Sequence, residues 1–466
     1  MKPSEYDLED PIVAIATALV PSALGIARAT GKGSIELAAK SFSRPKALLG
    51  AAGNTLVHGW ILGPGSERLD EVMVSVYRAP KSFTGEDSVE ITGHGGPATV
   101  LAVYRALVAS GFRPAERGEF SLRAFANGKA DLTKAEAIRE IIEAKTDEAR
   151  SRAADRLAGT LAAEMTAIRD DIVRALAAIE VEIEYPEDEE TTSGALDETL
   201  IDGAAKRLRA LASAWAAERL FQDGARVVLA GKTNAGKSSL FNALLKEDRA
   251  IVSDAHGTTR DWLESRADFL GIPVRLFDTA GFRETEDSVE AEGVERSLAL
   301  AENADVVLYL VDAIEGITDE DTEFLSSREG GSPPVIVVWN KSDRPNARVP
   351  ALTANIAELP VVAVSAKNGS GVQALVAAVS RALGSEARGT VRGERAPAPG
   401  SERQKDAIER SLQFLEHALE AAREGFPMDA VAQDLEEALG CIGEITGETS
   451  SADILDAVFS GFCVGK

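Results

Sequence analysis

The feature of this sequence that most constrains its fold is the octapeptide Gly-Lys-Thr-Asn-Ala-Gly-Lys-Ser at residues 231–238. It matches G-x-x-x-x-G-K-[ST], a loop whose backbone N–H groups surround the phosphates of a nucleotide. Residues 225–230 have the pattern of a buried strand, and residues 239–245 have the apolar spacing of a helix. In that context Lys237 would reach the β- and γ-phosphates, and the Ser238 hydroxyl would hold Mg²⁺. The alternative is a chance match in a glycine-containing turn, and the rest of the chain has to distinguish the two.

Three further motifs follow in the order expected of a GTPase. Asp278–Gly281 fits D-x-x-G, in which the aspartate contacts Mg²⁺ through water and the glycine N–H senses the γ-phosphate. Asn340–Asp343 ends in a carboxylate that can accept two hydrogen bonds from guanine, which adenine cannot supply. Ser365–Lys367 places the Ala366 N–H where it can meet the guanine O6. Each motif follows a predicted strand, and open α/β sheets bind ligands at the carboxyl ends of their strands, so the set predicts a GTPase.

The chain of 466 residues is predicted to be a multidomain α/β and α protein. Its first 120 residues or so alternate short apolar runs with turns, which predicts an α+β domain. A later stretch alternates strands and helices, which predicts a doubly wound α/β domain inserted into one discontinuous helical domain. The predicted bounds are 1–125 for the N-terminal domain, 126–222 and 385–466 for the helical domain, and 223–384 for the GTPase domain.

The apolar periods also predict individual elements. A capping box at Thr133–Glu136 opens an apolar stripe that reaches Ile183 without a proline, which predicts one long helix or two end to end. A second capping box, Ser450–Asp453, begins a last helix that runs to Phe459. Further helices are predicted at about 98–110, 197–221, 401–424 and 428–442, and strands at 11–16, 55–61, 71–77, 88–92, 225–230, 273–277, 305–311, 334–339 and 361–364.

Composition restricts the possible partners and the compartment. A net charge of −25 argues against a broad electrostatic footprint for nucleic acid or an anionic membrane, although a local basic groove is compatible with it. The two cysteines cannot form a disulfide framework and suit a reducing cytosol. The apolar run at 12–20 is too short to cross a bilayer, and no signal peptide is visible. The sequence therefore predicts a cytoplasmic protein.

The hydrolytic machinery is less obvious than the nucleotide site. Ras-like proteins place a water-orienting glutamine directly after D-x-x-G, and here that position is Phe282, which cannot orient water. Another group must therefore supply charge near the β- and γ-phosphates. Asn234 is a candidate ligand for a monovalent cation there, with backbone carbonyls of the loop 251–261 closing over it and Thr259 completing the Mg²⁺ shell. The alternative is that Asn234 only stabilises the loop.

These motifs resemble a known family. Residues 231–239, Gly257–Asp261 and 278–281 resemble the potassium-activated GTPases of the tRNA-modification and ribosome-assembly group. Two outlying features narrow the resemblance to the family of the tRNA modification GTPase MnmE, also called TrmE. Phe462–Lys466 looks like its C-terminal Cys-x-Gly-Lys signature, and three N-terminal segments look like its folate-binding domain: Phe83–Asp87, Gly93–Gly96 and Arg117–Phe125. The resemblance covers essentially the whole chain.

The resemblance implies an activity and a set of partners. Members of the family form homodimers through their N-terminal domains. They act with an FAD- and NADH-using flavoprotein, MnmG (GidA), as a heterotetramer, so FAD enters only through the partner. Together they add an aminomethyl or carboxymethylaminomethyl group at C5 of the wobble uridine of certain tRNAs. A tetrahydrofolate derivative supplies the one-carbon unit, and K⁺ and Mg²⁺ complete each GTPase site.

The resemblance also implies site residues. Glu290 matches the glutamate that orients the attacking water, although a solvated carboxylate at a helix start is the alternative. K⁺ would be held by Asn234, Ser253, Ala255 and Thr258, Mg²⁺ by Ser238 and Thr259, and folate by Arg28, Glu90, Lys129 and Lys466. The GTP-binding set is Asn234, Ala235, Gly236, Lys237, Ser238, Ser239, Ser253, Asp254, Ala255, His256, Gly257, Thr258, Thr259, Asp278, Thr279, Ala280, Gly281, Asn340, Lys341, Ser342, Asp343, Ser365, Ala366 and Lys367.

The two cysteines are interpreted differently, and one segment departs from the family pattern. Cys463 lies near the chain end after a glycine, where a reactive or site-lining thiol competes with a packing role, whereas Cys441 fits an apolar helical pattern. Around Arg28 the sequence is glycine-poor, and Ala29-Thr30 replaces the Ile-Ser of the family.

Two other classes of function share the nucleotide chemistry. One is a ribosome-assembly GTPase switch, which usually adds a basic RNA-binding module after the GTPase domain, where this chain has acidic helices. The other is a membrane-remodelling GTPase, for which the sequence shows no hydrophobic paddle or anchor.

Overall fold

The structure is a computed structural model, and it describes residues 2–184, 196–246, 263–278, 303–326, 332–347, 356–384 and 395–465. The chain separates into two compact units. The first comprises Met1–Arg139, Arg156–Arg209 and Asp406–Lys466, and the second comprises Glu140–Asp155 and Ala210–Lys405. The four domain bounds given above stay a prediction. None of the described helices is long and apolar enough to span a membrane.

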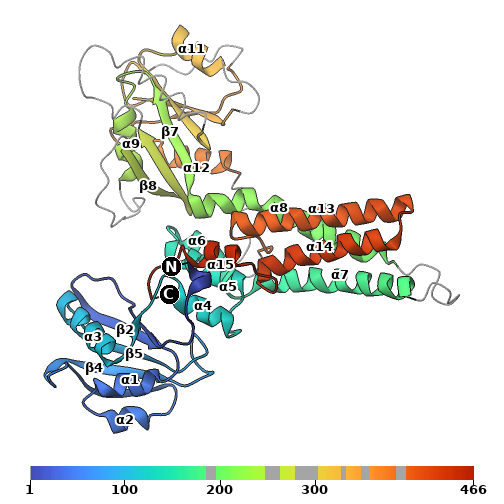
Figure 1. Ribbon diagram of the computed structural model, residues 1–466. Helices are drawn as coiled ribbons and strands as arrows, with labels where there is room; N and C mark the ends of the chain where they lie inside the picture. The colour runs from blue at the N-terminus through green and yellow to red at the C-terminus, as the bar shows by residue number, and fades with distance from the viewer. Residues whose placement is uncertain are drawn as a thin grey trace. The chain divides into compact units, whose positions relative to one another are not determined.

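The first unit contains a six-stranded sheet with the order β3-β4-β5-β2-β1-β6 (Figure 1). Neighbouring strands pair antiparallel except β1 and β6, which are parallel. The predicted strands at 55–61 and 71–77 are confirmed as β3 and β4, which pair as a hairpin on either side of Gly63–Gly65. The strands are β1 Ile12–Ile15, β2 Ser22–Thr30, β3 Thr55–Leu62, β4 Arg68–Tyr77, β5 Ser88–Gly95 and β6 Arg113–Pro114.

Three helices complete the core of this sheet. Strand residues with period-two burial, such as Val72 and Val74, pack with Ile35 of α1, Leu48 of α2 and Leu107 of α3. The predicted helix at 98–110 is confirmed as α3, whereas α1 and α2 are too short to give a clear period. The segment that departs from the family pattern is the strand β2. The helices are α1 Ser34–Lys40, α2 Pro45–Leu49, α3 Pro97–Ser110 and, with the short η1 Pro3–Glu5, α4 Glu119–Ala126.

The prediction of one or two helices between Thr133 and Ile183 is wrong, because three helices occupy this stretch. The Thr146 hydroxyl accepts a hydrogen bond from the Ala149 N–H at 3.2 Å and so begins a new helix. Gly159, with φ of +98°, ends that helix in the left-handed conformation. The helices are α5 Leu132–Glu143, α6 Asp147–Leu157 and α7 Thr160–Glu184.

Both predicted capping boxes are displaced. The Asp131 carboxylate, rather than Thr133, caps α5 by accepting from the Lys134 N–H at 2.7 Å. Ser451, rather than Ser450, caps the last helix, since its hydroxyl accepts from the Ile454 N–H at 3.3 Å. The predicted end of that helix at Phe459 is confirmed. In each case an adjacent polar residue offered an equally good oxygen, so the motif alone could not fix the register.

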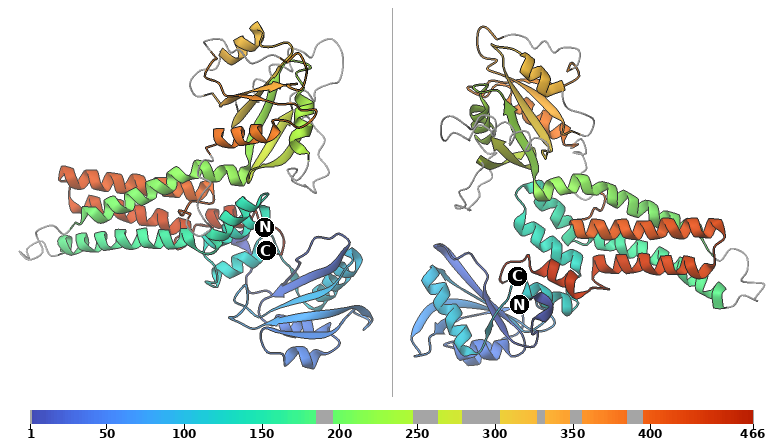
Figure 2. Two further views of the ribbon diagram at one scale, coloured as in Figure 1. Left: turned by 180° about the vertical axis from the view of Figure 1, so that it is seen from behind. Right: turned by 45° about the horizontal axis from the view of Figure 1, so that its top comes forward.

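The remaining helices form the rest of the helical part. Helices α7 and α14 lie side by side in both Figures 1 and 2, and α14 buries Val431, Leu435 and Ala438 completely. The predicted helices at 197–221, 401–424 and 428–442 are confirmed. They are α8 Glu198–Asp223, α13 Glu402–Glu424 and α14 Met428–Thr446, followed by α15 Ala452–Phe459.

The second unit contains a six-stranded sheet with the order β12-β11-β10-β7-β9-β8, in which only the β8–β9 pair is antiparallel. Alternate residues of β7 enter two different cores, Val227 with α9 and α12 on one face and Val228 with α11 on the other. All five predicted strands are confirmed, and β8 is additional. The elements are β7 Ala225–Gly231, α9 Lys237–Leu245, β8 Leu263–Phe269, β9 Ile272–Asp278, β10 Val306–Asp312, α11 Asp319–Ser326, β11 Val335–Asn340, β12 Val361–Ala363 and α12 Val372–Ala382.

Candidate functional site

The loop between β7 and α9 has the backbone shape that its two glycines allow. Gly231 has φ of +129° and Gly236 has φ of +100°, a region that side chains with a Cβ rarely adopt. A Cβ at Gly231 would lie 2.4 Å from the carbonyl oxygen of Leu310, and one at Gly236 would lie 2.3 Å from Nδ2 of Asn340. Both glycines are therefore required by close contact as well as by conformation. The chance-match alternative is excluded by this strand–loop–helix geometry.

Lys237 begins α9 and folds back over the loop. Its Nζ donates to the carbonyl oxygens of Gly231 at 2.7 Å and Lys232 at 2.8 Å. Burial lowers the pKa of Lys237, while the negative charge of Asp278 acts in the opposite direction. An ammonium group that is largely buried over backbone carbonyls is well placed to exchange those acceptors for phosphate oxygens, which are stronger acceptors.

Asn340 joins the segments that meet at the carboxyl edge of the sheet. Its side chain is 2% exposed, and its Nδ2 donates to the carbonyl oxygen of Ala235 at 2.8 Å. Its Oδ1 accepts from the Ala366 N–H at 3.1 Å. The last residue of β11 therefore links the phosphate loop to the loop after β12. Segments more than 100 residues apart in sequence are fixed relative to one another by one amide group.

The predicted base-binding residues lie beside this junction. Asp343 is exposed, and its hydrogen bond with Ser365 lowers the pKa of its carboxyl group, so the group stays ionised. The Ser342 N–H donates to the carbonyl oxygen of Val364 at 3.1 Å, which holds the two loops together. Lys341, at φ of +63°, forms an ion pair with Asp312 at the end of β10, at 2.6 Å. The Asp343 carboxylate is thus exposed beside the Ser365 loop, with which it shares a hydrogen bond.

Asn234 and Ser238 are the described candidates for cation binding. Asn234 is exposed with φ of +65°, and its side chain makes no hydrogen bond to any residue that the structure describes. Ser238 is exposed at the start of α9. Within the described residues no three His, Cys, Asp or Glu side chains cluster as a metal site would require.

Several predicted site residues lie outside the described residues. They are Ser253, Asp254, Ala255, His256, Gly257, Thr258, Thr259, Thr279, Ala280, Gly281, Glu290 and Lys466.

In the first unit the structure brings two predicted folate residues together. Arg28 and Glu90 are directly opposite on β2 and β5, and their charged groups lie 3.8 Å apart. The guanidinium stacks over Phe120 at 4.5 Å and over Phe83 at 5.1 Å, measured to the ring centroids. Burial lowers the pKa of Arg28, while Glu90 acts in the opposite direction. The result is a cluster of one cation, one anion and two aromatic rings, which we call the Arg28 cluster.

The C-terminal tail reaches the same place. Arg28 donates to the carbonyl oxygen of Gly465 at 3.2 Å, and the Cys463 carbonyl accepts from the Gly118 N–H at 3.4 Å. The Cys463 side chain is exposed. Lys129 follows α4 and contacts the loop that carries Phe83. Its Nζ donates to the carbonyl oxygen of Pro80 in that loop at 3.0 Å. Arg28 thus contacts both Glu90 and Gly465, and Cys463 lies two residues before Gly465 in the chain.

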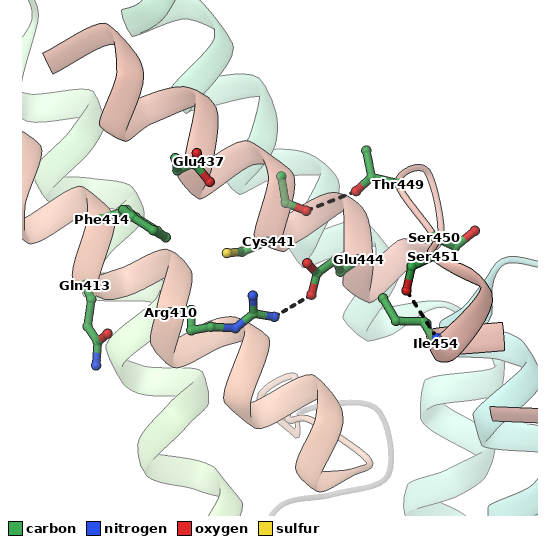
Figure 3. A pocket seen from close by; sticks show the side chains of 11 residues that line it. Arg410, Gln413, Phe414, Glu437, Cys441, Glu444, Thr449, Ser450, Ser451 and Ile454 are labelled. Atoms are coloured by element: carbon green, nitrogen blue, oxygen red, sulfur yellow. Dashed lines mark hydrogen bonds and ion pairs between the residues drawn. The ribbon is translucent and has the colours of Figure 1, made fainter. Parts of the chain in front are cut away.

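Cys441 belongs to a different part of the first unit. It is 4% exposed, as its apolar pattern predicts, and burial raises the pKa of its thiol. A cavity of about 660 Å³ opens above it between α13 and α14 (Figure 3). Arg410 and Glu444 form an ion pair across this cavity. None of the predicted site residues lines it.

Some contacts of the site could not be found from the sequence. Lys232 donates to the Thr318 hydroxyl at 2.6 Å and pairs with Glu320 at 2.8 Å, so the phosphate loop is tied to the start of α11. Phe83 and Phe120 belong to segments that the sequence marks, but only the fold stacks them on Arg28. The pairing of Lys341 with Asp312 likewise depends on strand order, since β10 and β11 are neighbours.

Comparisons with known proteins cover the whole chain. The model of the GTP-binding protein TrmE N-terminus matches residues 11–129, and the model of the MnmE helical domain matches residues 132–463. A tRNA modification GTPase MnmE from Treponema denticola is 53% identical over 476 residues, and one from Treponema pallidum is 46% identical over 507 residues. Both alignments cover 100% of this chain and 100% of the relative.

The match to a solved structure is partial. Aquifex aeolicus Era bound to GDP and aluminium fluoride is 27% identical, with 41% of this chain and 66% of that chain covered. Its TM-score of 0.27 is too low to support an argument. The full-length relatives, by contrast, match the whole chain, and the family models match its N-terminal and helical parts. That agreement favours the tRNA-modification family over the ribosome-assembly alternative, and the chain belongs to the MnmE family of tRNA modification GTPases.

Proposed function

We propose that this chain is a K⁺-dependent GTPase that, with an FAD-dependent MnmG-type flavoprotein, adds an aminomethyl or carboxymethylaminomethyl group at C5 of a tRNA wobble uridine. The observation that carries the GTPase part is the Asn340 junction, which fixes the phosphate loop and the base-binding loops at one sheet edge. The modification part is supported by family membership and by the meeting of Arg28, Glu90 and Gly465.

In this proposal the described residues bind and orient GTP. Lys237 exchanges its contacts with two backbone carbonyls for the β- and γ-phosphates, assisted by the N–H groups of residues 235–239 and the α9 N-terminus. The ionised Asp343 accepts from guanine N1–H and the amino group, and the Ala366 N–H faces O6. Asp278, 4% exposed at the end of β9, lies where it can meet the water shell of Mg²⁺.

The metal donors fit the cations that the family uses. Mg²⁺ keeps several waters and takes one or two protein ligands beside the phosphates, which matches the hydroxyls of Ser238 and Thr259. K⁺ would be held by Asn234, Ser253, Ala255 and Thr258. Bound there, the ion would supply the positive charge that an arginine finger supplies in other GTPases. Glu290 would orient the attacking water, since Phe282 cannot.

The Arg28 cluster suits a folate derivative. Phe83, which is 38% exposed, offers apolar surface to a pterin ring, and Glu90 can accept from its amino and N–H groups. Arg28, Lys129 and Lys466 suit ring carbonyls or the carboxylates of the glutamate tail. The Cys463 backbone adjoins the Arg28 cluster, and its thiol is proposed to take part in the modification chemistry. A homodimer and a heterotetramer with the flavoprotein are part of the proposal.

Potassium dependence tests the GTPase part. We expect GTP turnover by the full chain to be more than tenfold faster in K⁺ than in Na⁺, because charge supplied at the β/γ bridge is worth up to about 10³–10⁵ in rate. Asn234→Gly removes the amide oxygen while keeping a residue suited to φ of +65°, so it should abolish the K⁺ advantage and retain GDP binding. Turnover is measured by phosphate release at matched ionic strength.

The matched control is Asn242→Ala, an exposed asparagine on α9, which should keep the K⁺ advantage. Equal turnover of the wild-type chain in the two salts would contradict the cation role of Asn234.

Folate binding tests the modification part. Arg28→Ala should weaken binding of 5-formyltetrahydrofolate at least tenfold, because a charge-assisted contact with a carbonyl or carboxylate is worth about 1.5–3 kcal/mol. GTP turnover should not change. Arg68→Ala is the control. Arg68, on β4 of the same sheet, also stacks on an aromatic ring, that of Trp60 on β3, at 5.0 Å. Equal folate affinities for wild type and Arg28→Ala, measured by calorimetry, would remove Arg28 from the site.

A further inference from the structure

Positive charge is distributed unevenly along this acidic chain. The whole sequence carries 75 Asp and Glu against 50 Lys and Arg, whereas residues 31–129 carry nine against twelve. Four of these twelve cations lie on or beside α1 and α2, and within residues 32–46 the only carboxylate is Glu36. We call these four side chains the α1–α2 patch: Lys32, Lys40, Arg44 and Lys46.

The α1–α2 patch has no neutralising partners among the described residues. All four side chains are exposed, and none forms an ion pair with a carboxylate of the described part of the chain. Lys40 Nζ donates to the carbonyl oxygen of Ser110 at 3.3 Å, and Arg44 donates to that of His58 at 3.0 Å. These acceptors are neutral, so they position the cations without cancelling their charge. Helices α1 and α2 pack against each other, so the four cations lie on neighbouring elements (Figure 1).

The cations of the long helices in the same unit are arranged differently. Arg169, Arg207, Arg209, Arg410 and Arg423 each pair with a carboxylate: Glu448, Glu164, Glu416, Glu444 and Glu198, respectively. Their positive charge is therefore neutralised by ion pairs within the fold. An anionic partner would have to compete with those carboxylates, whereas it would meet the α1–α2 patch without breaking any ion pair.

We propose that the α1–α2 patch contacts the phosphate backbone of tRNA. The inference rests on the proposed function, which makes tRNA the polyanionic partner. Lys and Arg that neutralise phosphates release condensed counterions, and this provides binding free energy even for a chain of net negative charge. Phosphate contacts position a nucleic acid without reading its sequence. The patch therefore orients tRNA on the N-terminal sheet and leaves recognition of the wobble base to other groups.

The test is the salt dependence of tRNA binding by the full chain. Fluorescence anisotropy of a labelled tRNA transcript between about 50 and 200 mM KCl gives the slope of log K against log salt. The triple variant Lys40→Ala, Arg44→Ala, Lys46→Ala should reduce that slope by about 2, at 0.7–0.9 per lost phosphate contact, and weaken binding more than tenfold at the lowest salt. The loss should be equal for tRNAs with and without a wobble uridine.

The control triple Lys206→Ala, Arg209→Ala, Arg423→Ala removes the same charge from cations that pair with carboxylates, and should leave the slope unchanged. Equal effects of the two triples, or no effect of either, would overturn the proposal. So would patch-dependent binding to phosphatidylglycerol vesicles without binding to tRNA. Both triples should keep K⁺-dependent GTP turnover, so the proposed function can stand even where the patch fails.

Discussion

Asp343→Asn is expected to change the preferred base from guanine to xanthine. An aspartate accepts two hydrogen bonds from guanine N1–H and its amino group, whereas an asparagine offers one donor and one acceptor. That pair matches N1–H and the C2 carbonyl of xanthine. A site built to hydrogen-bond a group rejects analogues that lack it by about 10⁴-fold, so GDP affinity should fall by a factor of that order while XDP affinity rises. Fluorescent GDP and XDP give the two dissociation constants directly.

Asp319→Asn is the matched control for this change. Asp319 is an exposed carboxylate in the first turn of α11, and its replacement removes the same charge from the same unit. It should leave both affinities unchanged. Undiminished GDP binding by Asp343→Asn would place the base elsewhere, even though Ser365 holds the pKa of this carboxyl low and keeps it ionised.

The second large effect is expected from Asn340→Ala. The substitution leaves the Ala235 carbonyl and the Ala366 N–H without the partner that Asn340 gives each. An unsatisfied buried polar group costs about 1–3 kcal/mol, so the second unit should lose roughly 2–5 kcal/mol of unfolding free energy. GDP affinity should fall as well, because the phosphate loop and the base-binding loops are no longer fixed to one another. Scanning calorimetry of the full chain measures this loss of stability. The unfolding transition of the second unit is identified as the one whose temperature rises when GDP is added.

Two further variants sharpen this test. Asn340→Asp keeps the acceptor for Ala366 but loses the donor to Ala235, so it should separate the two hydrogen bonds. Asn368→Ala removes an exposed asparagine of the neighbouring loop, which accepts from the Ser370 N–H, and should have little effect. A wild-type transition temperature for Asn340→Ala would show that the junction contributes no stability.

Much of the architecture could be predicted because long periodic segments carry their own signal. In the nucleotide sheet the central parallel strands β10 and β11 are near-continuous apolar runs, as strands buried on both faces must be. β8 escaped prediction because Glu264, Ser265, Arg266 and Asp268 give it a polar sequence, and its place follows from the hairpin with β9. The breaks at 144–146 and 158–159 were missed because a single apolar stripe continues across them, and only the Thr146 cap and Gly159 reveal them.

The candidate site was predictable where chemistry is local and unpredictable where it depends on tertiary contact. Each nucleotide motif lies within three to eight consecutive residues, so sequence alone marks it. The double hydrogen bond of Asn340 and the attachment of Lys232 to α11 link strands that only the sheet order brings together. Arg28 and Glu90 were matched through the family, and their pairing depends on the register of β2 against β5.

The hydrogen bond from Arg28 to Gly465 spans 437 residues of chain, which sets an order of events during synthesis. A ribosome that adds about 5–20 residues per second makes Gly465 roughly 20–90 s after Arg28. Strands β1 to β6 all lie within residues 12–114, so the N-terminal sheet can pair throughout that interval. During that interval the Arg28 guanidinium lacks one of its hydrogen-bond acceptors, the Gly465 carbonyl oxygen. Translation thus separates the folding of the first sheet from the completion of the Arg28 cluster, since a nascent chain with a folded sheet still lacks the Gly465 contact.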